Sequence, residues 1–374
     1  MSNNCKTMVV KIGSSTLIGS DGKICRPFLS DMARQASELR ERGWNLVVVS
    51  SGAVACGFPL LGFSARPADM PSLQASASVG QCVLSAAWDE AFRERGLLTS
   101  LVLLTRHDTA QRSSYLHARE ALTRLLELGV VPIVNENDTT AVDEIRFGDN
   151  DTLAALVSCL VSADLCVTLS DIDGLYTANP VLDPAAKKID RVLCIDADVI
   201  ASAGDSSTSV GTGGMITKIR AARILMTAGI SSVICSGEEP SALVRLASGE
   251  SVGTLFEPSS ANAGLAPRKL WIALGDTTHG SVTVDEGASR ALVRDGSSLL
   301  PVGIRTVEGS FERGSVLDVC DETGMIIARG IAEASSDELQ LAAGRHQDEI
   351  IGNRLLAGLS GRPAIHRDNL IVFA

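Results

Sequence analysis

Short apolar runs alternate with longer segments of helical periodicity through the first two thirds of the chain. Runs rich in Val, Ile and Leu, as in buried strands, lie at residues 8–12, 45–49, 101–104, 130–134, 165–169 and 232–234. Apolar residues recur at helical spacing at 28–42, 114–128, 152–160 and 215–228. This alternation predicts an α/β fold, an open and mainly parallel sheet sandwiched by helices.

The pattern changes after residue 258, where small and polar residues take over. Short alternating segments with glycine-rich turns between them then follow at 280–284, 315–319 and 325–329. Such segments predict a small, mainly-β domain. We therefore divide the chain into a large domain at 1–258, a linker at 259–278, the small domain at 279–355 and a C-terminal tail at 356–374.

Small or polar residues follow the predicted strands at the point where each strand ends. They form four clusters, Gly13-Ser14-Ser15, Ser50-Ser51-Gly52, Asn135-Glu136-Asn137-Asp138 and Ser170-Asp171. The carboxyl ends of parallel strands meet at one edge of a sheet, where ligands bind. Loops need polar residues in any case, so one cluster indicates little, but the succession favours a ligand site.

Two lysines adjoin glycine-rich segments that could hold a phosphate. Lys11 precedes Gly13 at the end of the first strand, and Lys218 follows Gly211-Thr212-Gly213-Gly214 where a helix begins. Backbone N–H groups at a helix N-terminus attract phosphate, and glycine lets the backbone approach it. Neither a Walker A loop nor a dinucleotide-binding pattern is present. A solvated lysine and a flexible loop before an ordinary helix are the alternatives.

Carboxylates crowd the same predicted edge. Asp149 and Asp151 begin a helix shortly after the strand end that carries Asp138. Helix capping explains such residues without any function. Their crowding nevertheless requires nearby cations, for which Lys11 and Lys218 are candidates.

Composition narrows the possible partners. A formal net charge of −11 disfavours generic binding to nucleic acids or anionic membranes. The N-terminus leads directly into the first strand, and no apolar run approaches the roughly 20 residues of a membrane span, so we expect a cytoplasmic protein. The nine cysteines include no C-x-x-C pair and are expected to be reduced. The five dispersed histidines and the absence of a G-x-S-x-G motif disfavour hydrolase chemistry.

Taken in order, these motifs resemble the amino acid kinase family over nearly the whole chain. The similarity rests on Val9-Val10-Lys11-Ile12-Gly13-Ser14-Ser15, Ser50-Ser51-Gly52-Ala53-Val54-Ala55, Val134-Asn135-Glu136-Asn137-Asp138, Gly148-Asp149-Asn150-Asp151, Ser170-Asp171, Gly174-Leu175-Tyr176-Thr177 and Gly211-Thr212-Gly213-Gly214-Met215. The segment from about Gly280 to Arg354 resembles a PUA domain. The combination of motifs is specific, although no single motif is.

The resemblance implies ATP-dependent phosphorylation of the side-chain carboxylate of L-glutamate to L-glutamyl 5-phosphate, the first step of proline biosynthesis. A carboxylate with a pKa near ~4.3 is already ionised at neutral pH, so this reaction needs no general base. By the same resemblance, Lys11 and Lys218 stabilise the transferring phosphoryl group and Asp151 orients both lysines. The residues implied to hold glutamate are Ser51, Asp138 and Asn150.

The resemblance also implies cofactors and partners. The implied ATP-binding residues are Lys11, Ser170, Asp171, Thr212, Gly213, Gly214, Met215, Ile216, Thr217 and Lys218. Mg²⁺ is expected on the ATP phosphates, with protein ligands that the sequence does not identify. Proline is the implied feedback inhibitor, a glutamyl phosphate reductase consumes the reactive product, and the protein is expected to form a homo-oligomer.

Two other functions remain open from the sequence. One is a kinase for another small acid, such as acetylglutamate. The other is an RNA-binding regulator that acts through the PUA domain. Because Lys269 is the last lysine in the chain and Asp and Glu outnumber arginines in the small domain, nucleic acid is not an expected partner.

Overall fold

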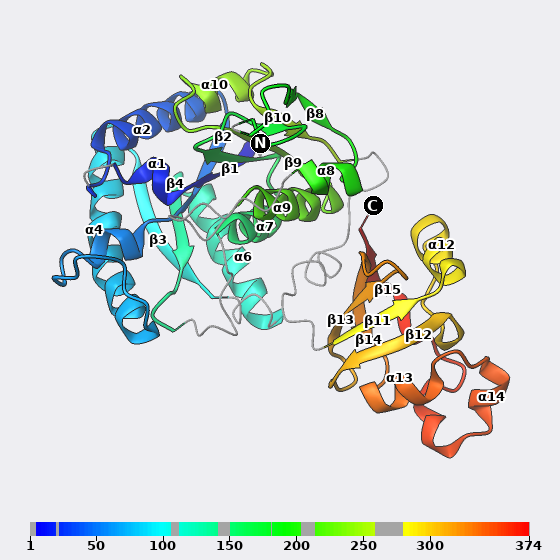
Figure 1. The fold of residues 1–374 in the computed structure, drawn as a ribbon. Helices are drawn as coiled ribbons and strands as arrows, with labels where there is room; N and C mark the ends of the chain where they lie inside the picture. Colours follow the sequence, from blue (N-terminus) through cyan, green and yellow to red (C-terminus); the bar gives the residue numbers. More distant parts are fainter. Residues whose placement is uncertain are drawn as a thin grey trace. The chain divides into compact units, whose positions relative to one another are not determined.

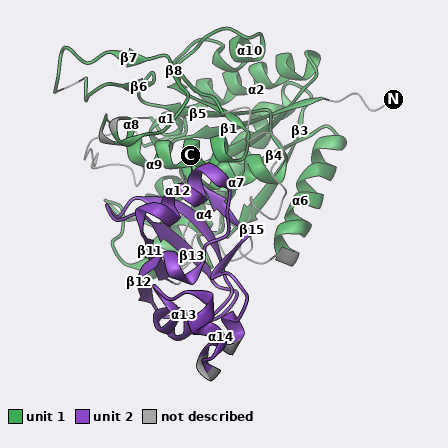
Figure 2. Cartoon of the chain, turned by 90° about the vertical axis from the view of Figure 1, so that its right-hand side faces the viewer, with its two compact units in different colours: residues 1–263 green, residues 264–374 purple. Residues whose placement is uncertain are grey.

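A computed structural model describes residues 5–19, 22–105, 112–140, 150–180, 182–202, 214–258 and 280–373. The chain divides into two compact units, Met1–Ala263 and Gly264–Ala374, which Figure 2 shows in green and purple. The predicted linker at 259–278 lies outside the described residues, so the proposed domain boundaries stay a prediction.

Unit 1 is built on an eight-stranded sheet with the strand order β3-β4-β2-β1-β5-β9-β10-β8. The bounds are β1 (Lys6–Ile12), β2 (Trp44–Ser50), β3 (Leu98–Leu104), β4 (Val130–Glu136), β5 (Leu165–Ser170), β8 (Arg191–Val192), β9 (Ser231–Ser236) and β10 (Thr254–Phe256). The first six strands in this order, from β3 at the edge through β4, β2, β1 and β5 to β9, pair in parallel. Strand β10 is antiparallel to β9 and parallel to β8. All six predicted strands of the large domain and the mainly parallel sheet are confirmed.

Helices cover both faces of this sheet (Figure 1). One face carries α2 (Arg26–Glu41), α4 (Met70–Arg93) and α10 (Ala242–Ala247), and the other carries α6 (Arg112–Glu127), α7 (Asn150–Leu160) and α9 (Met215–Thr227). The remaining short elements are α1 (Ser14–Leu17), α3 (Ala53–Gly57), α8 (Ala197–Ser202), β6 (Leu175–Tyr176) and β7 (Lys188–Ile189). The four predicted helices are confirmed. Within the described ranges, no helix combines the length and apolar character that crossing a bilayer requires.

Alternation along β1 sends its side chains to opposite faces of the sheet. Met8, Val10 and Ile12 are fully buried in the core that β1 shares with α2 and α4. Lys11 lies on the other face, where α7 packs against the strand. The strand thereby places one lysine beneath a helix in an otherwise apolar layer.

Helices α3 and α4 touch through their backbones. A Cβ atom added at Gly80 would lie 1.8 Å from the carbonyl oxygen of Ala53, and one at Gly57 would lie 1.8 Å from that of Ser76. Only glycine at both positions allows this close approach. The sequence pattern does not predict α4, because many of its buried positions are Ala, Ser and Gly, which give a weak apolar periodicity.

Unit 2 contains a five-stranded sheet with the order β12-β11-β13-β14-β15. The bounds are β11 (Gly280–Val284), β12 (Ile304–Gly309), β13 (Val316–Cys320), β14 (Ile326–Ala332) and β15 (Ile365–Val372), with helices α12 (Glu286–Asp295), α13 (Ser336–Ala342) and α14 (Gln347–Ile351). The predicted small, mainly-β domain is confirmed.

The segment 356–374 was predicted to be a C-terminal tail, but it contains the strand β15. Strand β15 pairs antiparallel with β14, and its residue Ile365 is fully buried in the core of unit 2. The charged and polar residues inside β15 interrupt its apolar alternation, which explains why the sequence pattern did not indicate a strand. These residues therefore complete the sheet instead of extending beyond it.

The α3–α4 contact gives a stability prediction. We expect Gly80→Ala to lower the free energy of unfolding by roughly 1–3 kcal/mol, because the new methyl group meets backbone that cannot move aside. This cost should appear although alanine favours a helix interior by about 1 kcal/mol over glycine. Chemical denaturation followed by Trp fluorescence measures it. Ser78→Ala, at an exposed site on the same helix, should change stability by less than about 0.5 kcal/mol. Equal stability of the two variants would contradict the prediction.

Candidate active site

Two of the predicted site residues, Lys11 and Lys218, meet around the buried carboxylate of a third, Asp151. The ammonium nitrogen of Lys11 lies 2.7 Å from Oδ1 of Asp151, and that of Lys218 lies 3.5 Å from Oδ2. Asp151 is only 1% exposed, and both lysines are buried. An isolated carboxylate is costly to bury, so the two lysines are required partners of this anion.

The charge state of this cluster follows from its contacts. Burial by itself would raise the pKa of Asp151, but the charges of Lys11 and Lys218 and a hydrogen bond from Thr217 hold that pKa below its ordinary value. Asp151 is therefore an anion at neutral pH. Two ammonium groups beside one carboxylate leave a net positive charge, which suits the binding of an anion.

Three elements bring these residues together. Lys11 stands near the carboxyl end of β1, Asp151 in the first turn of α7, and Lys218 in the first turns of α9. The N-cap of α9 is Gly214, which supplies no capping side chain, so the N–H groups of the first turn can serve a phosphate. Lysines and helix dipoles thus combine at one edge of the sheet.

A chain of amide groups lies beside this cluster. Nδ2 of Asn150 lies 2.8 Å from Oγ of Ser51, 3.0 Å from the backbone carbonyl oxygen of Ser50 and 3.1 Å from Oδ1 of Asn135, so these three acceptors share its two protons. Nδ2 of Asn135 donates in turn to Oε1 of Gln81 at 2.8 Å. We call these four side chains, Ser51, Asn150, Asn135 and Gln81, the amide relay. It connects the end of β2 with α7, β4 and α4.

The backbone carbonyl of Ser50 sets the direction of the amide relay. A carbonyl oxygen can only accept, so the group of Asn150 that faces it must be the amino group. Asn135 must then present its oxygen to Asn150 and its amino group to Gln81. The side-chain atom of Asn150 outside this chain of hydrogen bonds is therefore Oδ1, an acceptor.

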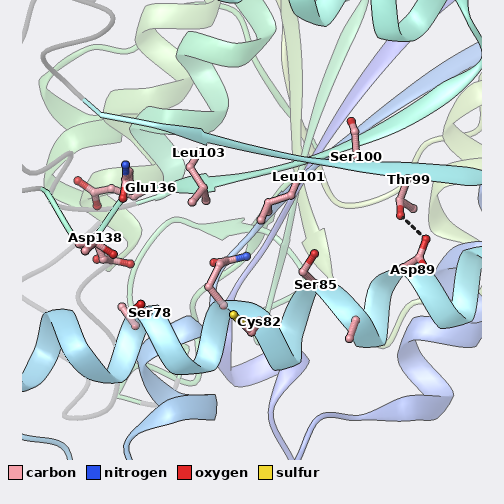
Figure 3. Close-up of a pocket in the computed structure, with 15 residues that line it drawn as sticks. Ser78, Cys82, Ser85, Asp89, Thr99, Ser100, Leu101, Leu103, Glu136 and Asp138 are labelled. Atoms are coloured by element: carbon pink, nitrogen blue, oxygen red, sulfur yellow. Dashed lines mark hydrogen bonds between the residues drawn. The ribbon is translucent and has the colours of Figure 1, made fainter.

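Asp138 lies at a cavity of about 650 Å³ on the other side of the relay. Its lining comes from one face of α4, from β3 and from the segment after β4. Figure 3 shows Glu136 and Asp138 at one end, and at the other end the hydrogen bond from Thr99 to Asp89, 3.1 Å long. Gln81 also lines this cavity, whereas Ser51 and Asn150 do not.

Of the predicted ATP-binding residues, Lys11, Gly214, Thr217 and Lys218 belong to the cluster around Asp151 and to the start of α9. The other six fall into three groups. Thr212 and Gly213 lie outside the described residues. Ser170 is buried at the end of β5 and donates to Oδ1 of the exposed Asp171 at 3.0 Å. The side chains of Met215 and Ile216 pack against the apolar cluster around Leu175 and Val192. These two residues can therefore offer a phosphate only their backbone N–H groups, which lie in the first turn of α9.

Tertiary packing creates parts of the site that no local motif of the sequence indicates. Asn135 lies in the motif at 134–138 but no role is predicted for it, and Gln81 lies on α4, which the apolar pattern did not indicate. Thr217 was predicted only as an ATP-binding residue, whereas its hydroxyl contacts Asp151. A buried Gln or Asn is a weak signal alone, because its partner is not visible in the sequence.

Models of two known families match most of the described chain. The model of the amino acid kinase family matches residues 6–236, and the model of the PUA domain matches residues 280–352. The first match includes Lys11, Asp151 and Lys218.

Three relatives, each named glutamate 5-kinase, match over almost their full length. Those from Geobacter sp. (strain M21) and Azoarcus sp. (strain BH72) are each 46% identical to this chain. The first match covers 98% of this chain and 97% of the relative, and the second covers 99% and 98%. The relative from Dehalococcoides mccartyi is 42% identical over 100% of both chains. The chain therefore belongs to the amino acid kinase family, within the group of the glutamate 5-kinases.

Proposed function

We propose that the protein transfers the γ-phosphoryl group of ATP to the side-chain carboxylate of L-glutamate, which gives L-glutamyl 5-phosphate, the first step of proline biosynthesis. The observation that carries this proposal is the buried Lys11–Asp151–Lys218 cluster at the edge of the sheet where β1, α7 and α9 meet. Membership in the glutamate 5-kinase group supports the choice of substrate.

The chemistry requires positioning and charge neutralisation more than proton transfer. The attacking carboxylate is ionised at neutral pH, and the transferring phosphoryl group carries negative charge on its oxygens. We propose that Lys11 and Lys218 bind these oxygens in the transition state, with Asp151 holding both ammonium groups in place. Preorganised charge of this kind costs no reorganisation during the reaction.

ATP is proposed to lie along the edge formed by the end of β5 and the start of α9. Its phosphates would face the first-turn N–H groups of α9, with Gly214 allowing a close approach. Ser170 and Asp171 offer hydrogen-bonding groups to the nucleoside. Thr212 and Gly213 remain part of this proposal on family resemblance alone.

Mg²⁺ is proposed to arrive with ATP. Among the described residues, no group of three or more His, Cys, Asp or Glu side chains is placed to hold a metal ion. Mg²⁺ usually keeps several waters and is bound through substrate phosphates with one or two carboxylates, so this mode needs no cluster of protein ligands. The ion would shield the negative charge of the phosphates.

The amide relay suggests how glutamate is oriented. Oδ1 of Asn150 accepts, so it suits the α-ammonium group, as does the carboxylate of Asp138. Ser51 accepts from Asn150, and its hydroxyl proton is then directed to a carboxylate oxygen of the substrate. An acylated amine carries no charge, which is why we propose glutamate and not acetylglutamate.

The remaining partners are also proposals. Proline shares the α-carboxylate and charged amine of glutamate and is proposed to inhibit at the same pocket. A reductase that uses the reactive acyl phosphate is the proposed next enzyme, and we propose a cytoplasmic homo-oligomer. An RNA-binding regulator is not favoured, because the family match includes the residues of the phosphoryl-transfer cluster.

The substrate assignment is tested by coupled measurement of ADP release. We expect release with L-glutamate, and rates at least about 10-fold lower with aspartate and N-acetylglutamate, since the first is too short and the second lacks the charged amine. Comparable kcat/KM values for glutamate and N-acetylglutamate would refute the assignment.

The roles of the two lysines are tested by Lys11→Ala and Lys218→Ala. Each change should lower kcat by about 10²–10³, because one preorganised charge at the phosphoryl group is lost. Lys6→Ala, at the opposite and exposed end of β1, is the matched control and should keep normal kcat. A variant at position 11 or 218 that folds and retains near-normal kcat would remove that lysine from the mechanism.

The shared pocket is tested by proline inhibition at several glutamate concentrations, in the wild type and in Asp138→Asn. We expect inhibition to weaken as glutamate rises, and the variant to lose affinity for both ligands by roughly 10- to 100-fold, since each loses a charge-assisted contact. Asp89→Asn, in the same cavity, should affect neither ligand strongly. Noncompetitive inhibition that Asp138→Asn leaves unchanged would place proline elsewhere.

A further inference from the structure

The carboxylate of Asp151 has a third donor that is neutral. The hydroxyl of Thr217 lies 2.7 Å from Oδ2 of Asp151, closer than the 3.5 Å that separates the same oxygen from the ammonium of Lys218. Thr217 directly precedes Lys218 in the first turn of α9. The tight contact to Oδ2 is therefore the hydroxyl, and the lysine contact is the looser one.

The hydroxyl also lies 2.8 Å from the carbonyl oxygen of Gly214, the N-cap of α9. A hydroxyl has one proton and donates to one acceptor at a time. An ionised carboxylate is the stronger acceptor, so the proton belongs with Asp151. Thr217 thereby ties the start of α9 to the carboxylate of α7.

We propose that Thr217 is a positioning residue that holds the Asp151 carboxylate while Lys218 engages the transferring phosphoryl group. This inference rests on the proposed function and goes beyond it. When the ammonium of Lys218 turns toward the substrate, Oδ2 would lose its charged partner in a buried site. The hydroxyl of Thr217 keeps Oδ2 hydrogen-bonded, so the carboxylate stays fixed and ionised and continues to hold Lys11.

Among the residues that the structure describes, the charged and titratable groups that face Asp151 come from three elements. They are Lys11 of β1, Lys218 of α9 and Cys166 of β5. Burial raises the pKa of the Cys166 thiol to about 12, so this group is neutral. Loss of the Thr217 hydroxyl removes one stabiliser of the Asp151 anion and raises the pKa of Asp151. Activity that depends on the anion should then begin to fall at a higher pH as the solution is acidified.

The experiment compares three variants of the full-length protein. Thr217→Val keeps the shape and removes the hydroxyl, whereas Thr217→Ser keeps the hydroxyl. Thr227→Val is the matched control, because Thr227 is buried in the same helix and donates to the carbonyl of Arg223 at 2.8 Å, away from Asp151. The measurements are kcat, the KM values for ATP and glutamate, the pH profile of kcat, and Tm.

We expect Thr217→Val to lower kcat by roughly 10- to 100-fold, with KM values within about 2-fold of wild type, since a hydrogen bond to a buried charge is lost. The acid limb of its kcat profile should move to higher pH. Thr217→Ser should recover most of the activity, and Thr227→Val should retain wild-type kcat and the wild-type acid limb.

Other outcomes overturn the proposal. A kcat within about 2-fold of wild type and an unmoved acid limb in Thr217→Val would exclude a positioning role. A higher KM for ATP at unchanged kcat would assign the hydroxyl to nucleotide binding instead. Thr217→Ala supplies the same comparison if Val prevents folding. A wild-type protein without activity on glutamate would refute the proposed function, which separates that failure from failure of this inference.

Discussion

The burial of one carboxylate constrains the arrangement of unit 1. Asp151 is almost fully covered, and a buried anion persists only where cations and donors compensate the loss of water. Lys11 and Lys218 supply that charge from β1 and α9, on either side of α7 in the sequence. In a parallel sheet the carboxyl ends of the strands and the N-termini of the helices that follow share one edge, and this arrangement lets the three residues meet.

The sequence predicted the regular part of this fold well because local patterns define it. Six apolar runs and four amphipathic helices of unit 1 follow from periodicity alone, and each residue predicted to act in phosphoryl transfer belongs to a local motif. Gln81 and Asn135 could not be recognised in this way. Their roles depend on hydrogen bonds between α4, β4 and α7 that exist only after packing. The strand β15 was missed because charged residues interrupt its apolar alternation.

The amide relay fixes which of its side-chain groups donate hydrogen bonds and which accept them. Asn and Gln can each present a donor or an acceptor, so a pocket built from them is ambiguous by itself. A single backbone carbonyl, that of Ser50, removes the ambiguity along the whole chain of amides. The buried indole of Trp88 in turn donates to the hydroxyl of Ser50 at 3.1 Å, which anchors α4 at this strand end. In the proposed mode of glutamate binding, recognition of the charged amine therefore depends on packing several residues away from the ligand.

The distance in sequence between Lys11, Asp151 and Lys218 also affects the order in which unit 1 can fold during synthesis. During synthesis Lys11 and Asp151 emerge well before Lys218 and Thr217, which lie near the C-terminal end of unit 1. Until α9 is available, the Asp151 anion has one lysine and cannot be buried at low cost. We therefore expect the half-made sheet to stay open around α7, with closure and the onset of activity coming together when α9 docks. The incomplete chain on the ribosome would therefore have no kinase activity before α9 is made.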